Sequence, residues 1–293
     1  MKTILVTGAT GFIAKSFINE FTNKYNFINV SHRKVANHIT LDDLELQPEL
    51  LKNVDYVINL AGANIAEKRW SIARKSLLIH SRIDTTKRLV ALLNQYNDKA
   101  YFISASAVGI YSPNIESDEL TTINYQDYIN FSQELTKKWE LEVSNYHGKY
   151  AIARFGVVLS AKGGAFPQML NPFLKFVGGK LATGSQFFPW IALPDLLHAL
   201  DYMLSQQSNG VYNFVAPSII NNQKLCEQIS QIWNRPNWLN LPDWVVKLVF
   251  GQLGQELFLN SLIVKPSKLL ELNFDFKYPD IGSCLQAIKQ NLI

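Results

Sequence analysis

Apolar residues along the chain gather in short continuous runs, and longer amphipathic segments lie between these runs. Runs of strand length that are apolar almost throughout predict strands buried on both faces of a sheet. The segments between them repeat apolar residues at helical spacing, as Phe12, Phe17 and Phe21 do within 11–25. This alternation predicts a Rossmann-type, doubly wound α/β fold, in which a parallel sheet lies between two layers of helices.

The pattern predicts six strands and four main helices before the C-terminal part of the chain. The strands are expected at 3–6, 26–31, 54–62, 99–106, 150–160 and 210–216. The helices are expected at 11–25, 69–96, 125–147 and 193–206.

The composition of the sequence changes after Ser160, where glycines and prolines cluster. Such a stretch is typical of a loop-rich lid over a binding site, and we place this lid at about 161–194. Residues 1–230 would form the dinucleotide-binding domain that carries the lid. Residues 237–293 would form a smaller, mostly helical C-terminal region that completes the substrate cleft.

Composition and charge exclude several classes of protein. The chain has 293 residues with a net charge of +4, and its basic residues are scattered among acids, so we expect no nucleic-acid partner. Cys226 and Cys284 lie far apart, and neither they nor the five histidines show a metal-ligand spacing, so no metal site is expected. The most apolar late segment, 244–264, is interrupted by polar residues and reads as amphipathic, and we expect no signal peptide at the N-terminus. We therefore expect a cytoplasmic protein with no membrane partner.

The stretch "VTGATGFIA" places Gly8, Gly11 and Ala14 between the first strand and the first helix. Gly8 would let the chain turn tightly off the strand, and Gly11 would let the backbone approach a diphosphate. The helix that begins near Phe12 would direct its free N–H groups at that diphosphate. The third position needs only a small residue for close packing, so Ala14 suffices. The sequence therefore predicts a dinucleotide-binding loop.

The end of the second strand bears on which dinucleotide is bound. An acidic residue there selects NAD because it accepts hydrogen bonds from the ribose hydroxyls. Here the residues are Ser31, His32, Arg33 and Lys34, and none is acidic. Arg33 either pairs with a 2′-phosphate or lies solvated at the surface. We predict NADP(H) in preference to NAD(H).

Three motifs carry a resemblance to a known family: "TGATGFIA", "VINLAG" and "FISASAVGIY". They resemble motifs of the extended, epimerase-like branch of the short-chain dehydrogenase/reductase superfamily. Longer stretches, among them "RFGVVLSAKGGAFPQML", resemble the YfcH-like epimerase proteins, which carry a C-terminal segment of unknown function. The resemblance covers nearly the whole chain and implies a possible homodimer. It also implies cofactor contacts at Gly8, Thr10, Gly11, Phe12, Ile13, Ser31, His32, Arg33, Leu60, Ala61, Gly62 and Ser104.

The superfamily's chemistry uses a Tyr as proton donor or acceptor and a Lys four residues later that lowers the pKa of the Tyr. None of the twelve tyrosines is followed by Lys at that spacing. Counting back from Glu140, which matches the acid after the usual Lys, puts Thr136 at the Lys position and Ser132 at the Tyr position. Loss of the general acid removes a factor of roughly 10²–10⁴ from the rate of such a reaction.

Other side chains are candidates to replace the missing pair. Ser106 matches the superfamily's substrate-binding Ser, and Tyr111 could supply a phenol. Arg82 lies where the superfamily often has Asn, and a cation there could polarise a substrate oxygen. Structural roles stay open for all three: Ser106 as a backbone cap, Tyr111 as a packed aromatic, and Arg82 as a surface or ion-pair group.

Two functions remain at this point. The leading hypothesis is an NADP(H)-binding oxidoreductase or epimerase of the extended short-chain type. It would transfer a hydride at a carbinol or carbonyl carbon of a small-molecule substrate, with a nucleotide sugar suggested by analogy alone. The alternative is a catalytically weak NADP(H)-binding module with a regulatory or redox-sensing role.

Overall fold

Six parallel strands form the central sheet of the computed structural model, which describes residues 1–293. The strand order is β2-β1-β3-β4-β6-β9, and every neighbouring pair is parallel. The strands are β1 (Lys2–Thr7), β2 (Tyr25–Val30), β3 (Tyr56–Asn59), β4 (Tyr101–Ala107), β6 (Tyr150–Phe155) and β9 (Gly210–Phe214). The chain runs outward from β1 to β2, returns to β3 on the other side of β1, and continues outward from there. This order confirms the doubly wound α/β fold and makes the β1–β3 gap the topological switch point.

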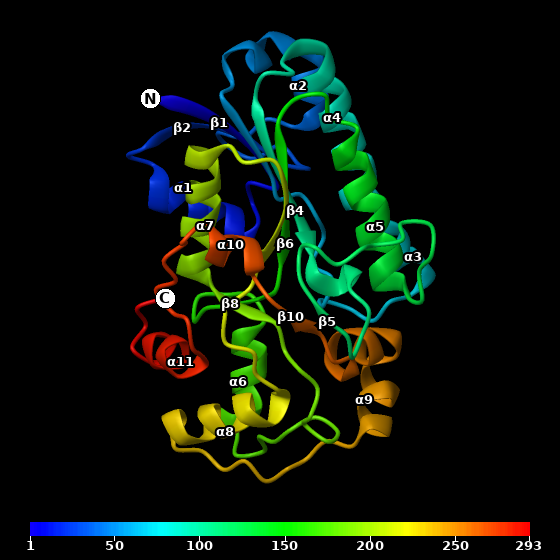
Figure 1. The fold of residues 1–293 in the computed structure, drawn as a ribbon, viewed down its shortest axis with the longest axis vertical. Coiled ribbons are helices and arrows are strands. Elements are labelled where there is room, and N and C mark those ends of the chain that lie inside the picture. The colour runs from blue at the N-terminus through cyan, green and yellow to red at the C-terminus, as the bar shows by residue number, and fades with distance from the viewer.

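Helices cover both faces of the sheet (Figure 1). The helices α1 (Phe12–Phe21) and α7 (Leu193–Gln206) pack on one face. The helices α2 (Leu41–Leu46), α4 (Thr85–Tyr96) and α5 (Phe131–Ser144) pack on the other. Alternate residues of each strand enter the two separate cores, which is why the strands are apolar almost throughout.

The long helix expected at 69–96 is a continuous helical segment in three parts. It begins with α3 (Ile72–Ile79), continues through a π-helical turn, η2 (His80–Asp84), and ends with α4. Ser71 caps its start by accepting a hydrogen bond from the Arg74 N–H. Turns of π-helix inside longer helices occur frequently at functional sites, and this one carries Arg82.

The helix expected at 11–25 ends at Phe21, the strand expected at 54–62 spans only Tyr56–Asn59, and two further elements differ more strongly from the sequence prediction. The strand expected at 150–160 divides at Gly156 into β6 and β7 (Val157–Leu159), which pairs with β8 (Trp190–Ala192) in a separate small sheet. A Cβ at Gly156 would lie 2.9 Å from the Pro189 carbonyl oxygen, so the close approach of the two segments requires glycine there. The helix expected at 125–147 begins only at Phe131, because Asn130 caps it by accepting from the Gln133 N–H.

Several short elements were not predicted from the sequence. One of them, α6 (Phe166–Leu174), lies within the glycine- and proline-rich lid and has a proline in its first turn. The others are α2, η1 (Pro48–Asn53), η3 (Val108–Ile110), β5 (Glu116–Ser117) and β8, and the longer helix α8 (Asn222–Trp233) was not predicted either.

The C-terminal segment, residues 237–293, is interleaved with the rest of the chain (Figure 1). Its elements are α9 (Asp243–Phe250), the π-helical η4 (Gly254–Leu259), β10 (Ile263–Val264), α10 (Ser267–Glu271) and α11 (Ile281–Lys289). The strand β10 pairs with β5, and α11 packs against α8. The carboxylate of Asp195, at the start of α7, accepts hydrogen bonds from the Lys277 and Tyr278 N–H groups at 2.8 and 3.0 Å. No helix in the protein is both long enough and apolar enough to cross a membrane.

Candidate cofactor and substrate site

The turn from β1 into α1 packs directly against the end of β3. Gly8 has a φ of +67°, and a Cβ built there would lie 2.5 Å from the Leu60 carbonyl oxygen. The Gly11 N–H donates to the Gly8 carbonyl oxygen at 2.7 Å and closes the turn. The positive φ of Gly8 and its contact with the Leu60 carbonyl oxygen both require glycine at that position. The turn lies at the switch point between the carboxyl ends of β1 and β3.

The start of α1 is open to an anion. Its N-cap is Gly11, which supplies no side-chain cap, and its first turn contains no acidic residue. The first-turn N–H groups and the positive end of the helix dipole therefore have no partner from a side chain of the protein. This cradle fits the diphosphate of a dinucleotide. The segment predicted as a lid reaches it, because Gly163 packs so closely on the Phe12 ring that a Cβ would lie 2.7 Å from a ring carbon.

At the end of β2 the chain turns away from the sheet. The Ser31 hydroxyl is buried and donates to the Arg33 carbonyl oxygen at 2.6 Å, which fixes this turn. The side chain of Arg33 is exposed and makes no hydrogen bond or ion pair with the protein. The neighbouring Lys34, in contrast, pairs with Asp43 at 3.1 Å. Arg33 is thus the cation at this strand end that is free to bind a phosphate.

Arg82 is a guanidinium without an acidic partner. Its Cζ would lie 3.0 Å from a Cβ built at Gly62, and it stacks 5.4 Å from the centre of the Trp139 ring. Its one hydrogen bond within the protein is a long one, 3.4 Å, to the Leu78 carbonyl oxygen. Burial, and to a lesser extent the charge of Arg74, lowers the pKa of Arg82 to about 10, so it stays cationic at neutral pH. An oxygen-rich ligand at the end of β3 would supply the missing partner.

Ser106 and Tyr111 meet in one buried network. The Ser106 Oγ donates to Glu140 Oε1 at 2.6 Å, and Arg154 donates to both oxygens of that carboxylate, at 2.8 Å each. Arg154 Nη1 also donates to the Tyr111 hydroxyl at 2.8 Å. The Tyr111 hydroxyl in turn reaches Asn213 Oδ1 at 2.9 Å, and burial raises the pKa of Tyr111. Both predicted residues are therefore hydrogen-bonded inside the protein, around a buried ion pair.

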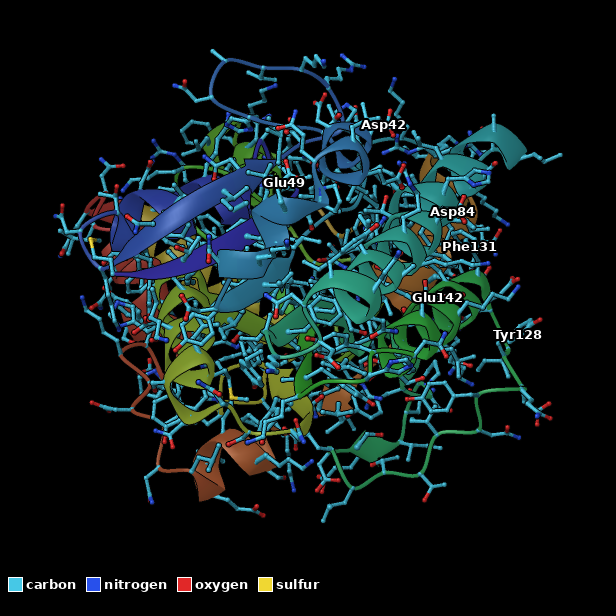
Figure 2. The ribbon with its side chains drawn as sticks, turned by 90° about the horizontal axis from the view of Figure 1, so that it is seen from above. Asp42, Glu49, Asp84, Tyr128, Phe131 and Glu142 are labelled. Atoms are coloured by element: carbon cyan, nitrogen blue, oxygen red, sulfur yellow. The ribbon has the colours of Figure 1, made fainter.

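The positions of the missing Tyr and Lys are also occupied by internal hydrogen bonds. The Ser132 N–H and hydroxyl both donate to Glu256 Oε2, at 2.8 and 2.7 Å. The Thr136 hydroxyl donates to the Ser132 carbonyl oxygen at 2.7 Å. Glu256 comes from η4 in the C-terminal segment. Figure 2 shows Phe131, at the start of α5, beside the orange ribbon of that segment.

Glu256 was missed by the sequence analysis. It is 8% exposed and also accepts from the Phe131 N–H at 3.3 Å and from Gln252 Nε2 at 2.6 Å. A carboxylate at the N-terminus of α5 is stabilised by the helix dipole as well as by these donors. Nothing near Glu256 in the sequence marks it, because its partner Ser132 is 124 residues away.

Three groups contain the remaining predicted cofactor residues other than His32, which is exposed beside Ser31. Leu60, Ala61 and Gly62 lie at the end of β3, facing the turn that contains Gly8 and the side chain of Arg82. Ser104 is fully buried one strand further on, where its hydroxyl accepts from Asn59 Nδ2 at 3.1 Å and orders the strand ends. Thr10 and Ile13 flank Gly11 and are half-buried. No group of three or more His, Cys, Asp or Glu side chains is placed to hold a metal ion.

Comparison with known proteins gives matches over nearly the whole chain. Residues 4–214 match the model of the NAD dependent epimerase/dehydratase family, and residues 241–288 match a domain of unknown function, DUF1731. An epimerase family protein of Staphylococcus saprophyticus is 31% identical over 98% of this chain and 99% of its own length. The chloroplastic SDR39U1 homologue of Arabidopsis thaliana, also an epimerase family protein, is 32% identical over 98% of this chain and 87% of its own. The crystal structure of human epimerase family protein SDR39U1 (isoform 2) with NADPH is 30% identical, covers 99% of both chains and superposes with a TM-score of 0.91.

Proposed function

This chain belongs to the NAD-dependent epimerase/dehydratase family, and from that premise we propose that it is an NADP(H)-binding oxidoreductase or epimerase acting on a small molecule. The family match confirms the epimerase-like resemblance drawn from the sequence. The observation that carries the proposal is the Gly8 turn, packed against Leu60 beneath a helix start that no side chain caps.

The choice of NADP(H) over NAD(H) is supported by Arg33. Its side chain has no partner within the protein and follows the strand end that lies beside the ribose in this fold. The human relative, which was solved with NADPH, supports the same choice. Guanidinium groups bind phosphate through two parallel hydrogen bonds, so one exposed arginine suffices to favour a 2′-phosphate.

The bound nicotinamide would accept or supply a hydride. Of the three predicted catalytic residues, we propose that Arg82 alone contacts the ligand, because its guanidinium has no acidic partner. It would bind an oxygen of the cofactor or substrate and stabilise negative charge there. Ser106 and Tyr111 would act as positioning residues, since both hold the Glu140–Arg154 pair at the ends of β4 and β6. A nucleotide-sugar substrate, a cytoplasmic location and a homodimer stay predictions.

A regulatory or redox-sensing module is the second candidate. The observation in its favour is that Ser132 and Thr136, at the positions of the usual Tyr and Lys, are both hydrogen-bonded to other protein groups. Protein that binds NADPH tightly and converts none of a panel of carbonyl compounds and nucleotide sugars would support the module. Turnover that falls at least tenfold in Arg82→Met would support the enzyme.

The cofactor preference is tested by titrating the protein with NADPH and with NADH, using nicotinamide fluorescence. We expect NADPH to bind at least tenfold more tightly, and Arg33→Ala to remove most of that difference by weakening NADPH alone. Lys34→Ala is the matched control, because the charge of Lys34 is already paired with Asp43. Equal affinity of the unmodified protein for the two cofactors would refute the preference.

A further inference from the structure

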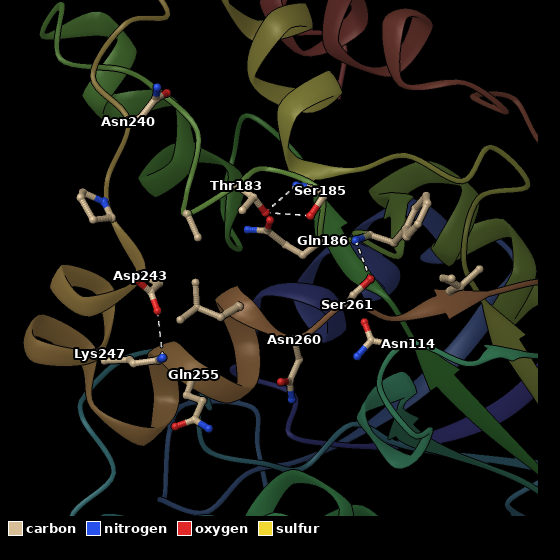
Figure 3. Close-up of a pocket in the computed structure, with 15 residues that line it drawn as sticks. Asn114, Thr183, Ser185, Gln186, Asn240, Asp243, Lys247, Gln255, Asn260 and Ser261 are labelled. Carbon is tan, nitrogen blue, oxygen red and sulfur yellow. Dashed lines mark hydrogen bonds and ion pairs between the residues drawn. The ribbon is translucent and has the colours of Figure 1, made fainter.

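A cavity of about 880 Å³ lies between the lid, the loop after β4 and the C-terminal segment (Figure 3). Its walls come from 182–187 of the lid, from Asn114, and from 240–263 of the C-terminal segment. A neighbouring cavity of about 380 Å³ shares Gln255 and Asn260 with it and includes Glu256. Cavities of a few hundred cubic ångströms are large enough for a small-molecule ligand.

Four side-chain amides on the wall of the larger cavity have no protein partner. Asn114, Asn240, Gln255 and Asn260 all line it, and the amide of each makes no hydrogen bond to another protein group. In Figure 3 no dashed line reaches any of these four side chains. Each amide offers two donors and an acceptor, so together they match a ligand whose groups both donate and accept. Hydroxyl groups have that property.

The charge on the wall is balanced. Asp243 and Lys247 are the charged residues of the larger cavity, and they pair with each other at 3.0 Å along α9. Glu256, in the smaller cavity, accepts its hydrogen bonds from α5 and from Gln252. No arginine or lysine on either wall is free to pair with a phosphate, which usually needs such a cation.

We propose that these cavities bind an uncharged, hydroxyl-rich molecule, a sugar or polyol without a nucleoside diphosphate, and that Asn260 and Gln255 hold it. The inference rests on the proposed function for this molecule's role as substrate, although neither cavity includes Arg82 or a residue of the cofactor cradle. It departs from the nucleotide-sugar analogy for a physical reason, which is that neither wall offers a diphosphate a free cation.

The experiment measures ligand binding by saturation-transfer NMR and calorimetry on the full chain, with and without NADP⁺. The ligands are uncharged hexoses, pentitols and myo-inositol in one arm, and UDP, UDP-glucose and glucose 6-phosphate in the other. We expect binding in the uncharged arm, weakened about tenfold or more by Asn260→Leu, which keeps the volume and removes the amide. Asn23→Leu, at an exposed asparagine outside both cavities, is the matched control and should bind as the unmodified protein does.

Two further variants keep the test decisive. Gln255→Leu replaces an exposed side chain with no hydrogen bonds, so it tests the same wall if Asn260→Leu fails to fold. Asp243→Asn leaves Lys247 without its partner and should create binding of glucose 6-phosphate, because a free cation then lines the cavity.

Tighter binding of UDP or UDP-glucose than of every uncharged ligand, lost in Asn260→Leu, would overturn the inference. So would absence of binding in the uncharged arm by protein that binds NADPH normally, since the amides would then hold only water. Loss of NADPH binding instead refutes the proposed function, and the arm without cofactor still tests the cavity. The two failures are therefore distinguishable.

Discussion

Replacing Glu256 should detach the C-terminal segment from the start of α5. Its carboxylate accepts from the Ser132 N–H at 2.8 Å, the Ser132 hydroxyl at 2.7 Å, the Phe131 N–H at 3.3 Å and Gln252 at 2.6 Å. Ser132 and Phe131 are 7% and 6% exposed, so water cannot readily replace the lost acceptor. Glu256→Ala therefore leaves buried donors of α5 without a partner.

The magnitude follows from these donors. A buried polar group left unsatisfied costs about 1–3 kcal/mol, so two such groups on Ser132 give about 2–6 kcal/mol. Loss of a carboxylate from the positive end of α5 adds about 0.5–1 kcal/mol. Gln252 is exposed and can turn to solvent, so it adds little. We expect Glu256→Ala to lower the free energy of unfolding by about 2.5–7 kcal/mol, and Glu256→Gln, which keeps one acceptor oxygen, by about 1–2 kcal/mol.

The assay is urea unfolding followed by tryptophan fluorescence, which the six tryptophans of the chain make sensitive. Gln255→Ala is the matched control, because Gln255 is the neighbouring residue, is exposed and makes no side-chain hydrogen bond. A double-mutant cycle with Ser132→Ala should give a coupling energy of about 1 kcal/mol or more. The reasoning would be refuted if Glu256→Ala and Gln255→Ala unfolded at the same urea concentration.

Two further predictions concern buried groups. Arg154→Met leaves the Glu140 carboxylate buried without its cation. Urea unfolding should show that this variant loses about 3–5 kcal/mol of unfolding free energy, against less than about 1 kcal/mol for Arg88→Met, whose ion pair is exposed. Equal losses in the two variants would contradict the assigned burial. Burial raises the pKa of the Cys226 thiol to about 12 and also raises the pKa of Cys284, so at pH 8 very little thiolate is present. Ellman's reagent should therefore modify neither cysteine in the native protein at pH 8 and both in guanidinium chloride, with reactivity rising as pH rises; fast reaction of the native protein would show that the thiols are accessible.

Local features of the sequence were enough to predict the fold class and the cofactor cradle. The run of apolar residues in β1 and the helical spacing after it determine the elements, because burial on one or two faces imposes those periods. The turn at Gly8 could be predicted from the residue type, because its φ of +67° and its backbone contact both require the absence of a side chain. The start of α5 was misplaced by six residues, from 125 to Phe131, because Tyr125, Tyr128 and Ile129 before the cap repeat at helical spacing by chance.

Only the tertiary structure decided which polar groups remain free for a ligand. Ser106 and Tyr111 match their motif, yet their hydroxyls are hydrogen-bonded within the Glu140–Arg154 network, while Arg82 has no acidic partner. Glu256 and its partner Ser132 are more than a hundred positions apart in the chain. The wall of the larger cavity likewise combines Asn114 with residues of 240–263. A hydrogen bond depends on a distance of about 3 Å and on the angle of its donor, and residue order fixes these only within one turn or one strand pair. The sequence by itself thus predicted a cradle for a diphosphate, and the packing of the C-terminal segment decided which polar groups line the two cavities.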